Sequence, residues 1–302
     1  MRIHRERDAM NSRSGRGDST SPERGDSNDA AHMQGREFAW TNADFDKVQS
    51  MIYSRAGISL HDGKHAMVYS RLSRRLRDTG HQSFSGYLTW LEATEGPEWQ
   101  EFVNALTTNL TSFFREQHHF DIFAEYLKTK PPGTSWNVWC SAASTGEEPY
   151  SIFMTALETL GQRGNFTLKA SDIDSKVLAT AAQGAYRLEG LKGVSPERMK
   201  QFFLRGKGAN EGKVRVKSEL AQRIEFLIVN LIRDDWPFRD PFDVVFCRNV
   251  MIYFDSQTQR KVLERIHRVM KPGGLLFVGH AENFSDSRDL FALNGKTVYE
   301  RR

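Results

Sequence analysis

The chain has 302 residues, a formal net charge of +4 and a pI near 9.0. This length can hold one large domain or two modest ones, each with an adequate core. No apolar run approaches the ~20 residues that cross a membrane, and no apolar block follows the charged N-terminus as in a secretory signal. These features argue against a membrane-spanning or secreted protein, so we expect a cytoplasmic one. Cys140 and Cys247 fall in predicted buried strands and are interpreted as reduced core residues, a disulfide pair being the weaker interpretation.

The first segment of the chain, residues 1–35, is rich in Arg, Asp, Ser and Gly and contains almost no large apolar side chains. Such a segment cannot bury enough surface to offset its ordering entropy, so it is predicted to be a disordered tail. Its arginines and acidic residues balance, which argues against a nucleic-acid-binding arm.

Residues 36–127 show helical periodicity without a convincing strand and are predicted to form an N-terminal all-α domain. The informative helix covers 64–77 and has apolar residues four positions apart, at Val68, Leu72 and Leu76. Its basic residues are Lys64, Arg71, Arg74, Arg75 and Arg77. They form either a solvated helix face or a surface that steers an acidic partner to the protein, and the pattern alone leaves both interpretations open.

Segment 109–120 mixes amide, hydroxyl, aromatic and guanidinium groups, which is unusual for a helix that only packs. Asn109, Thr111 and Arg115 are candidates to face a ligand, and a guanidinium such as that of Arg115 can hold a carboxylate with two hydrogen bonds. His118 and His119 are neighbours in sequence and lack a Cys or a second His at helical spacing, so no metal site is predicted.

Residues 128–302 alternate strands with helices, which predicts an α/β domain with a mainly parallel, doubly wound sheet. A buried strand at 136–140 leads into a turn of small residues at 141–146 and then a helix. The next strand ends at Asp172, and an acidic residue at that position binds a ribose in doubly wound sheets.

The turn at 141–146 limits which ligand this domain can bind. It contains only one glycine, so the dinucleotide fingerprint is absent. Glu147 and Glu148 open the following helix, where they would repel a pyrophosphate. A ligand with a cationic end and a ribose, such as S-adenosylmethionine (SAM), fits these residues better. A site for an unrelated ligand is the alternative.

The rest of the domain supplies further sheet elements and an insertion. Helices are predicted at 175–183 and 257–270, and the strands at 275–278 and 296–299 form an antiparallel edge. Between 184 and 222 the alternation breaks, because two short strands flank the glycine-rich segment 206–212. This antiparallel β-subdomain is either a peptide-accepting sheet or a structural flap.

Four blocks of sequence, at 105–116, 141–151, 170–174 and 246–254, closely resemble the CheR-type methyltransferases of bacterial chemotaxis receptors. The resemblance runs from about Asp44 to Tyr299 with the motifs in order. It implies the Rossmann-like fold of class I SAM methyltransferases, with SAM as cofactor and S-adenosylhomocysteine as product. It also implies that the enzyme forms methyl esters on glutamate side chains of receptor cytoplasmic helices, during sensory adaptation.

The resemblance carries residue roles over to this sequence. The implied cofactor-binding residues are Asn109, Thr111, Arg115, Glu148, Asp172, Asn230, Leu231, Arg248 and Asn249. Glu148 would bind the methionine ammonium, Asp172 the ribose hydroxyls, and Asn230 and Leu231 would lie beside the adenine. Arg115 and Tyr253 are the expected catalytic residues, and the basic residues of helix 64–77 are expected to bind the receptor. In the family, the inserted subdomain docks an aromatic pentapeptide at the C-terminus of some receptors.

Two other functions compete with this interpretation. A nucleic-acid methyltransferase would carry an Asn/Asp-Pro-Pro-aromatic motif where this chain reads Arg-Asn-Val-Met at 248–251. A SAM-sensing adaptor that has lost catalysis is opposed by the presence of Arg115, Arg248 and Tyr253. We therefore expect a monomeric enzyme that binds a chemoreceptor, with no nucleic-acid partner and no membrane insertion.

Overall fold

A computed structural model of the chain describes residues 35–161 and 164–302. The predicted disordered tail 1–35 lies, except for Gly35, outside these residues. The compact unit discussed below is Trp40–Arg302. None of the helices in the described residues is long and apolar enough to cross a membrane.

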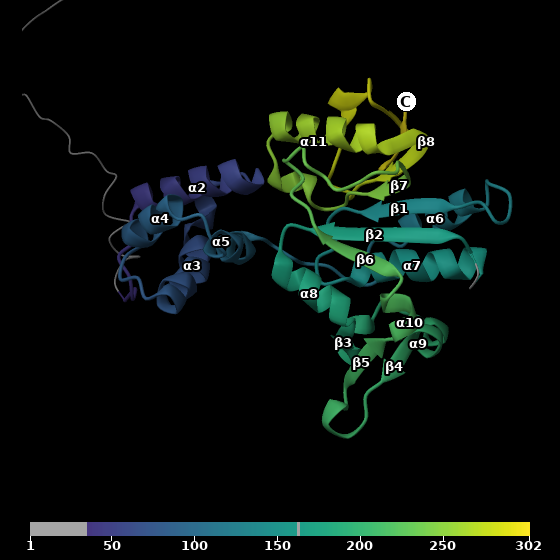
Figure 1. Cartoon of the computed structure of the whole chain (residues 1–302), viewed down its shortest axis with the longest axis horizontal. Coiled ribbons are helices and arrows are strands. Elements are labelled where there is room, and N and C mark those ends of the chain that lie inside the picture. Colours follow the sequence, from purple (N-terminus) through teal and green to yellow (C-terminus); the bar gives the residue numbers. More distant parts are fainter. Residues whose placement is uncertain (1–34, 162–163) are drawn as a thin grey trace, which may run out of the picture. The chain divides into compact units, whose positions relative to one another are not determined.

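The N-terminal part of this unit is helical, as predicted (Figure 1). Its helices are α2 (Asn42–Ala56), η1 (Asp62–Lys64), α3 (His65–Thr79), α4 (Phe84–Ala93), α5 (Glu98–Leu106) and α6 (His118–Leu127). Thr41 and Asp44 begin α2 with a capping box, in which each side chain accepts a hydrogen bond from the other residue's backbone N–H. Helix α6 falls inside the predicted helical domain 36–127, yet its apolar side chains pack in the core of the sheet described next.

The described part of the C-terminal region contains a seven-stranded sheet in the order β6-β2-β1-β7-β8-β10-β9. Its strands are β1 (Trp136–Cys140), β2 (Phe166–Asp172), β6 (Ile224–Ile228), β7 (Phe242–Phe246), β8 (Met270–Phe277), β9 (Phe291–Leu293) and β10 (Val298–Arg301). The first five strands of that order are parallel, and β10 is antiparallel to both β8 and β9. The predicted mainly parallel sheet with an antiparallel edge is confirmed. The short strand β9 was not predicted.

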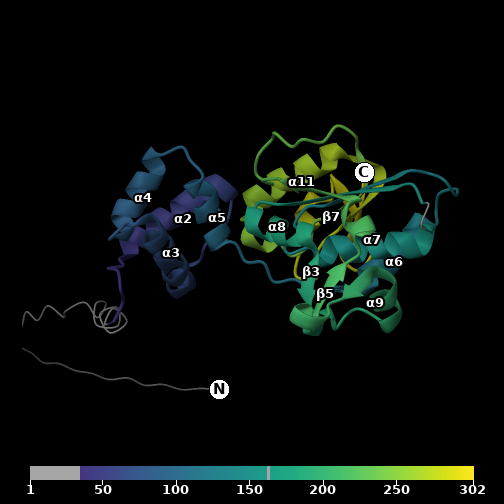
Figure 2. The ribbon, with the colours of Figure 1, turned by 60° about the horizontal axis from the view of Figure 1, so that its bottom comes forward.

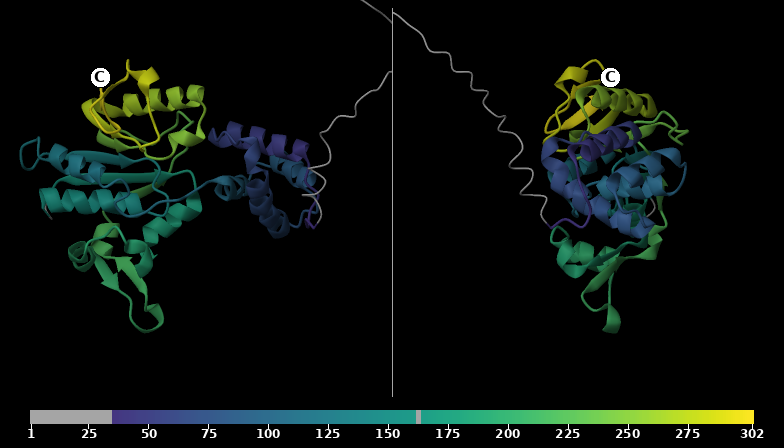
Figure 3. Two further views of the ribbon diagram at one scale, coloured as in Figure 1. Left: turned by 180° about the vertical axis from the view of Figure 1, so that it is seen from behind. Right: turned by 90° about the vertical axis from the view of Figure 1, so that its left-hand side faces the viewer.

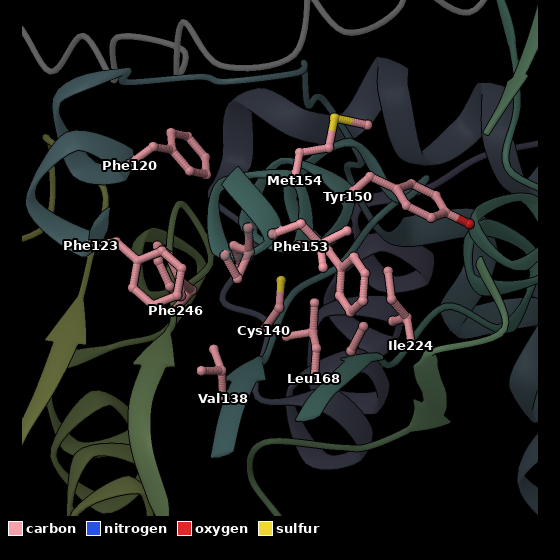
Figure 4. Close-up of a cluster of buried hydrophobic side chains, with 14 of the residues drawn as sticks. Phe120, Phe123, Val138, Cys140, Tyr150, Phe153, Met154, Leu168, Ile224 and Phe246 are labelled. Atoms are coloured by element: carbon pink, nitrogen blue, oxygen red, sulfur yellow. The ribbon is translucent and has the colours of Figure 1, made fainter. Parts of the chain in front are cut away.

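Each face of the sheet is buried under helices. On one face Val138 and Cys140 of β1 lie in register with Val244 and Phe246 of β7, in one core with α6 and α7 (Glu147–Leu160). Figure 4 shows this core, with Phe153 of α7 over the strands. Because successive side chains of a strand point to opposite faces, the residues between these positions form a second core with α11 (Ser256–Val269). Figure 2 shows α11 and α7 on either side of β7.

The helices that cover the sheet begin at residues that satisfy their first backbone N–H groups. Asp174 caps α8 (Ser175–Gln183) by accepting from the N–H groups of Lys176 and Val177, and Asp255 caps α11 by accepting from that of Thr258. These caps place the first turns of both helices at the carboxyl ends of the strands. The predicted helices at 175–183 and 257–270 are confirmed within one residue.

The insertion 184–222 forms a separate three-stranded antiparallel sheet in the order β3-β5-β4. Its elements are β3 (Ala185–Arg187), η2 (Leu188–Leu191), α9 (Pro196–Phe202), β4 (Phe203–Arg205), η3 (Gly208–Asn210), β5 (Lys213–Val216) and α10 (Ser218–Ala221). Val214 and Val216 are buried while Lys213 and Arg215 are exposed, as their alternation predicted. Figure 3 shows the insertion in green and the C-terminal strands in yellow at opposite ends of the large sheet.

Tyr186 of β3 connects this insertion to the turn that follows β1. Its hydroxyl donates to the backbone carbonyl of Thr145 at 2.8 Å, and its ring packs edge-on against Phe113 with centroids 5.0 Å apart. A Cβ on Gly146 would lie 2.7 Å from the Tyr186 hydroxyl. The turn and the insertion are therefore closely packed against each other.

Candidate functional site

A cavity of about 350 Å³ lies at the carboxyl ends of the parallel strands β1, β2 and β7. This is where open α/β sheets bind their ligands. Residues that follow the strands line the cavity together with residues from the helical part. The predicted site residues that line it are Lys64, Asn109, Thr111, Arg115, Glu148, Asp172, Asn230, Leu231, Arg248, Asn249 and Tyr253. Lys64 is the last residue of η1, and the basic residues of α3 at positions 71, 74, 75 and 77 are not among the lining residues.

The turn after β1 is fixed by hydrogen bonds to two other segments. The backbone N–H of Ser144 donates to Asp172 Oδ2 at 2.8 Å, and the Ser144 hydroxyl donates to the carbonyl of Asn109 at 2.9 Å. Ser144 has a φ of 48°, and Asn249, which also lines the cavity, has a φ of 57°. Left-handed backbone at residues other than glycine is uncommon and concentrates at functional sites.

Asp172 is the acidic residue at the end of β2. Its carboxylate accepts from the N–H of Ser144 and, at 3.0 Å, from the N–H of Asp174. Burial raises the pKa of Asp172 to about 6, although these hydrogen bonds act in the opposite direction. A carboxylate offers about four acceptor positions, so this one retains capacity for the hydroxyl groups of a ribose.

Asp174 anchors the linker between the helical part and the sheet. One carboxylate oxygen caps α8, and the other accepts from Thr107 Oγ1 at 2.7 Å and from Asn109 Nδ2 at 2.8 Å. The side chain of Asn109, predicted to contact the cofactor, therefore also holds the linker in place. Gln100 and Asn104 of α5 add hydrogen bonds from this side, to Ile173 O and to Ser175.

Arg248 and Glu148 form a buried ion pair at one end of the cavity. Arg248 Nη1 donates to Glu148 Oε2 at 2.6 Å, and Nη2 donates to the carbonyl of Arg115 at 2.5 Å. Burial raises the pKa of Glu148, and the charge of Arg248 acts against this rise. Within the described residues Glu148 Oε1 accepts only from the thiol of Cys140, at 3.4 Å. Because a thiol is a weak donor, this oxygen has capacity for a strong donor such as an ammonium.

Glu116 lies beside this pair and forms a cluster with two histidines. The ligand atoms of Glu116, His118 and His119 lie within 4.8 Å of one another. Among the described residues, the buried Glu116 Oε2 and His119 Nδ1 have no hydrogen-bond partner. Burial and the charge of Arg248 lower the pKa of His119 to about 4. Arg248 Nη2 lies 3.5 Å from Glu116 Oε2 and would repel a metal cation there, so we assign no metal to this cluster.

The two candidate catalytic residues lie on segments with defined backbone contacts. Tyr253 belongs to the 3-10 helix η4 (Met251–Tyr253), and its carbonyl accepts from the N–H of Ser59 at 2.8 Å. Arg115 Nη1 donates to the carbonyl of Leu110 at 3.0 Å. A guanidinium has five N–H donors, which leaves Arg115 with donors for a ligand carboxylate.

Comparison with known protein families shows to which family the chain belongs. The SAM binding domain of the CheR methyltransferases matches residues 109–299, and the all-alpha domain of the same family matches residues 43–107. The chain belongs to the CheR methyltransferase family. The predicted family and the predicted cofactor, SAM, are thereby confirmed.

Relatives of this CheR methyltransferase cover most of its length. The chemotaxis protein methyltransferase of Klebsiella aerogenes is 50% identical over 277 residues, which are 91% of this chain and 94% of the relative. That of Salmonella typhimurium is 51% identical over 266 residues (87% and 92%), and that of Escherichia coli is 49% identical over 263 residues (86% and 91%).

The buried Glu282 is a site residue that the sequence patterns did not reveal. Its carboxylate accepts from the backbone N–H groups of Asn249 at 2.9 Å, Met251 at 2.8 Å and Gly279 at 2.6 Å. These bonds fix the segment after β7, which carries Arg248, Asn249 and Tyr253 into the cavity. Glu282 has no conspicuous neighbours in the sequence, so only the folded arrangement identifies its role.

The helical part of this CheR methyltransferase contacts the sheet part directly beside the cavity. Asn230 Nδ2 donates to the carbonyl of Arg55 at 2.8 Å, and the Tyr53 hydroxyl donates to Asp255 Oδ2 at 2.6 Å. At the end of α2, a Cβ on Gly57 would lie 2.5 Å from Ile232 Cγ2. These contacts position the lining residues that follow α2.

The basic residues of α3 have different surroundings. Arg71 donates to the carbonyl of Thr107 at 2.6 Å. Arg75 donates to both carboxylate oxygens of Glu98, at 2.9 and 2.6 Å, and its side chain is only 13% exposed. Arg74 is 80% exposed and lies 3.9 Å from Asp78. Arg71 and Arg75 thus hold α3 to its neighbours, while Arg74 faces solvent.

Proposed function

We propose that this protein transfers the methyl group of SAM to glutamate side chains on the cytoplasmic helices of chemoreceptors, forming methyl esters. The observation that carries the proposal is the cavity at the strand ends, because all the residues implied for cofactor binding and catalysis line it. Identity of about half to chemotaxis protein methyltransferases over most of the chain supports the same substrate class. A substrate of this class places the reaction in the cytoplasm.

The residues of the cavity fit the chemical groups of SAM. Glu148 Oε1 has capacity for the methionine ammonium, and Asp172 has capacity for the ribose hydroxyls. Asn230 and Leu231 lie at the end of β6 and are proposed to contact the adenine. Asn109, Thr111, Arg248 and Asn249 complete the proposed set. When bound, SAM supplies a methyl group on a positively charged sulfur, which is readily transferred to a nucleophile.

The substrate carboxylate needs no general base. A glutamate has an unperturbed pKa of ~4.3, so it is ionised at neutral pH. The remaining task is orientation, which can contribute ~7–11 kcal/mol to lowering a barrier. We assign this task to Arg115 and Tyr253, because both line the cavity on segments fixed by backbone hydrogen bonds.

The receptor-facing surface is assigned to helix α3. Lys64, which directly precedes α3, lines the cavity, and Arg74 is exposed on the helix itself. Clustered positive charge raises the rate of encounter with an acidic partner. Arg71, Arg75 and Arg77 belong to the same helix, although Arg71 and Arg75 have intramolecular partners.

The insertion is proposed to bind the aromatic pentapeptide at the C-terminus of some receptors. Strands β3 and β4 are the two edges of its sheet. An exposed edge strand can bind an extended peptide through main-chain hydrogen bonds. The glycine-containing segment 206–212 between β4 and β5 matches the longer form expected of family members that use this docking mode.

Transfer of a tritiated methyl group from SAM to a purified receptor cytoplasmic fragment tests the proposal. The label should be released by mild base, as from a carboxyl ester, and should disappear when the receptor glutamates are replaced by alanine. Base-stable label on the receptor, label on nucleic acid, or SAM binding without transfer would each contradict the proposal. Arg115→Ala should lower turnover at saturating receptor, and unchanged turnover would remove Arg115 from the mechanism.

A further inference from the structure

Two apolar side chains at the cavity are unusually exposed. Leu110 is 81% exposed, the highest value for a large apolar side chain among the described residues, and Ile252 is 51% exposed. Both line the cavity, although they come from segments far apart in the chain. Single exposed apolar residues are common on protein surfaces, but two that line one cavity need a reason.

Both side chains stand on backbone that the structure holds in place. The carbonyl of Leu110 accepts from Arg115, and the preceding residue, Asn109, is bound to Asp174. Ile252 follows Met251, whose N–H donates to Glu282 Oε1 and whose carbonyl accepts from Gln259. The exposure of these two side chains is therefore a fixed feature of the folded backbone.

The helical part adds apolar groups and a charge to the same opening. Ile58, Leu60 and Met67 line the cavity and are partly exposed, and Lys64 lines it with them. The opening thus combines apolar surface with positive charge from Lys64 and Arg115. This combination is complementary to a carboxylate that has apolar side chains beside it.

We propose that Leu110 and Ile252 form an apolar rim that packs against the apolar residues next to the substrate glutamate and thereby selects which glutamates are methylated. The inference rests on the proposed function, because its occupant is a receptor helix. On an amphipathic helix, the residues three and four positions from a glutamate lie beside it, and those nearest the apolar stripe are hydrophobic.

The rim has a chemical consequence for the reaction. Apolar contacts around the glutamate exclude water from the opening, which strengthens the interaction of its carboxylate with Arg115. A glutamate with charged or polar residues at the adjacent helix positions would not form these contacts. It should therefore bind less well, although its carboxylate is chemically identical.

Replacement of the rim residues tests the proposal. Leu110→Ser and Ile252→Ser should each raise the KM for the receptor fragment about tenfold, since serine removes most of the apolar surface that the receptor would bury. The affinity for S-adenosylhomocysteine, measured by calorimetry, should change less than twofold. Leu110→Met should retain a KM near that of the unsubstituted protein. The matched control is Leu293→Ser, which removes a side chain that is 65% exposed on β9 and does not line the cavity.

A substrate variant makes the test independent of folding. In the receptor fragment, the apolar residues three and four positions from one methylated glutamate are replaced by serine. The unsubstituted enzyme and the Leu110→Ser enzyme are then each assayed on the original and on the changed fragment. The unsubstituted enzyme should lose about tenfold in kcat/KM on the changed substrate, and the Leu110→Ser enzyme should lose much less. If both enzymes lose the same factor in kcat/KM, or if Leu110→Ser also lowers the affinity for S-adenosylhomocysteine in parallel, the proposed apolar rim is wrong. If the unsubstituted enzyme does not methylate the receptor at all, the proposed function fails, which is a different result.

Discussion

Asp172 combines burial with a position at the ribose end of the proposed cofactor site. Its pKa is raised from 3.8 to about 6, mainly by burial, with backbone hydrogen bonds opposing the rise and the nearby Asp174 adding to it. Between these two pH values, Asp172 is protonated in the folded protein and ionised in the unfolded chain. This one group therefore adds to the free energy of unfolding as the pH falls from 6 towards 4.

The same protonation should weaken cofactor binding at low pH. The affinity for S-adenosylhomocysteine should fall as the pH drops below about 6, by at most about tenfold per pH unit, because a protonated Asp172 accepts fewer hydrogen bonds. Calorimetry between pH 5 and 8 measures this. Asp172→Asn should bind more weakly at pH 7.5 and show a smaller change with pH. The pKa of Glu148 is also raised by burial, so some dependence will remain. Identical pH profiles for both proteins would contradict the assignment.

Glu282 supports a prediction about stability. Glu282→Gln places an amide N–H₂ where a carboxylate oxygen accepts backbone N–H groups, and unsatisfied buried groups cost about 1–3 kcal/mol each. Urea unfolding should show a loss of this size, accompanied by weaker binding of S-adenosylhomocysteine. Glu264→Gln is the control, because Glu264 forms an exposed pair with Arg260 and its replacement should change stability by less than about 0.5 kcal/mol. Equal stabilities of the two variants would show that Glu282 does not hold the segment.

At the scale of single residues, the sequence identified side chains expected to contact the ligand better than the side chains that hold them in place. Asp172 and Glu148 stand at a strand end and a helix start, so local pattern and family resemblance both point to them, whereas the family resemblance alone points to Arg248. Glu282 and Glu116 act through partners distant in the chain, such as Asn249 and Arg248. Contacts of that kind are set by the tertiary fold and leave no periodic signal.

Helix α3 shows the limit of pattern reading for a whole element. Its apolar stripe correctly predicted the helix and its buried face. The pattern could not show which arginines would have partners, because Glu98 of α5 approaches Arg75 only in the folded protein. The same applies to β9, whose three residues are too few to give a signal.

Replacement of the arginines of α3 should affect the free energy of unfolding at Arg75 but hardly at Arg74. Arg75→Ala breaks a largely buried bidentate pair with Glu98 and should lower the free energy of unfolding by about 1–3 kcal/mol. Arg74→Ala should change it by less than about 0.5 kcal/mol, since its pair with Asp78 is exposed. Receptor KM should rise for Arg74→Ala while cofactor affinity stays constant. A receptor KM unchanged by Arg74→Ala and by Arg74→Glu would remove α3 from the receptor surface.

At the scale of the whole molecule, the proposed site depends on how the helical part meets the sheet. The match of one family domain to 43–107 and another to 109–299 shows that both parts belong to the family. The sequence predicted both parts and some of the residues that line the cavity, such as Arg115 and Arg248, but not Ile58 or Met67. It could not predict the contacts at Gly57 and Tyr53, because these depend on shape complementarity between surfaces.

Gly57 and Gly80 provide a matched test of that contact. Both end a helix in the left-handed region, with φ of 71° and 76°, so alanine costs about 1–2 kcal/mol of strain at either position. A Cβ at 57 would also collide with Ile232, whereas a Cβ at 80 would meet no atom of the described residues within 4 Å. Gly57→Ala should therefore lose more stability and weaken binding of S-adenosylhomocysteine, and Gly80→Ala should lose stability alone. Similar nucleoside affinity in both variants would show that the contact does not shape the cavity.

The hydrogen bond from Tyr186 to Thr145 has a consequence for how this molecule can vary. Because Gly146 has no room for a side chain against that hydroxyl, the turn and the insertion must change together. An insertion taken from a distant homologue would have to place a tyrosine hydroxyl at the same position. Otherwise the turn would lose the hydrogen bond to the Thr145 carbonyl. We expect the two segments to be inherited as a unit, and chimaeras that exchange one without the other to bind the nucleoside poorly.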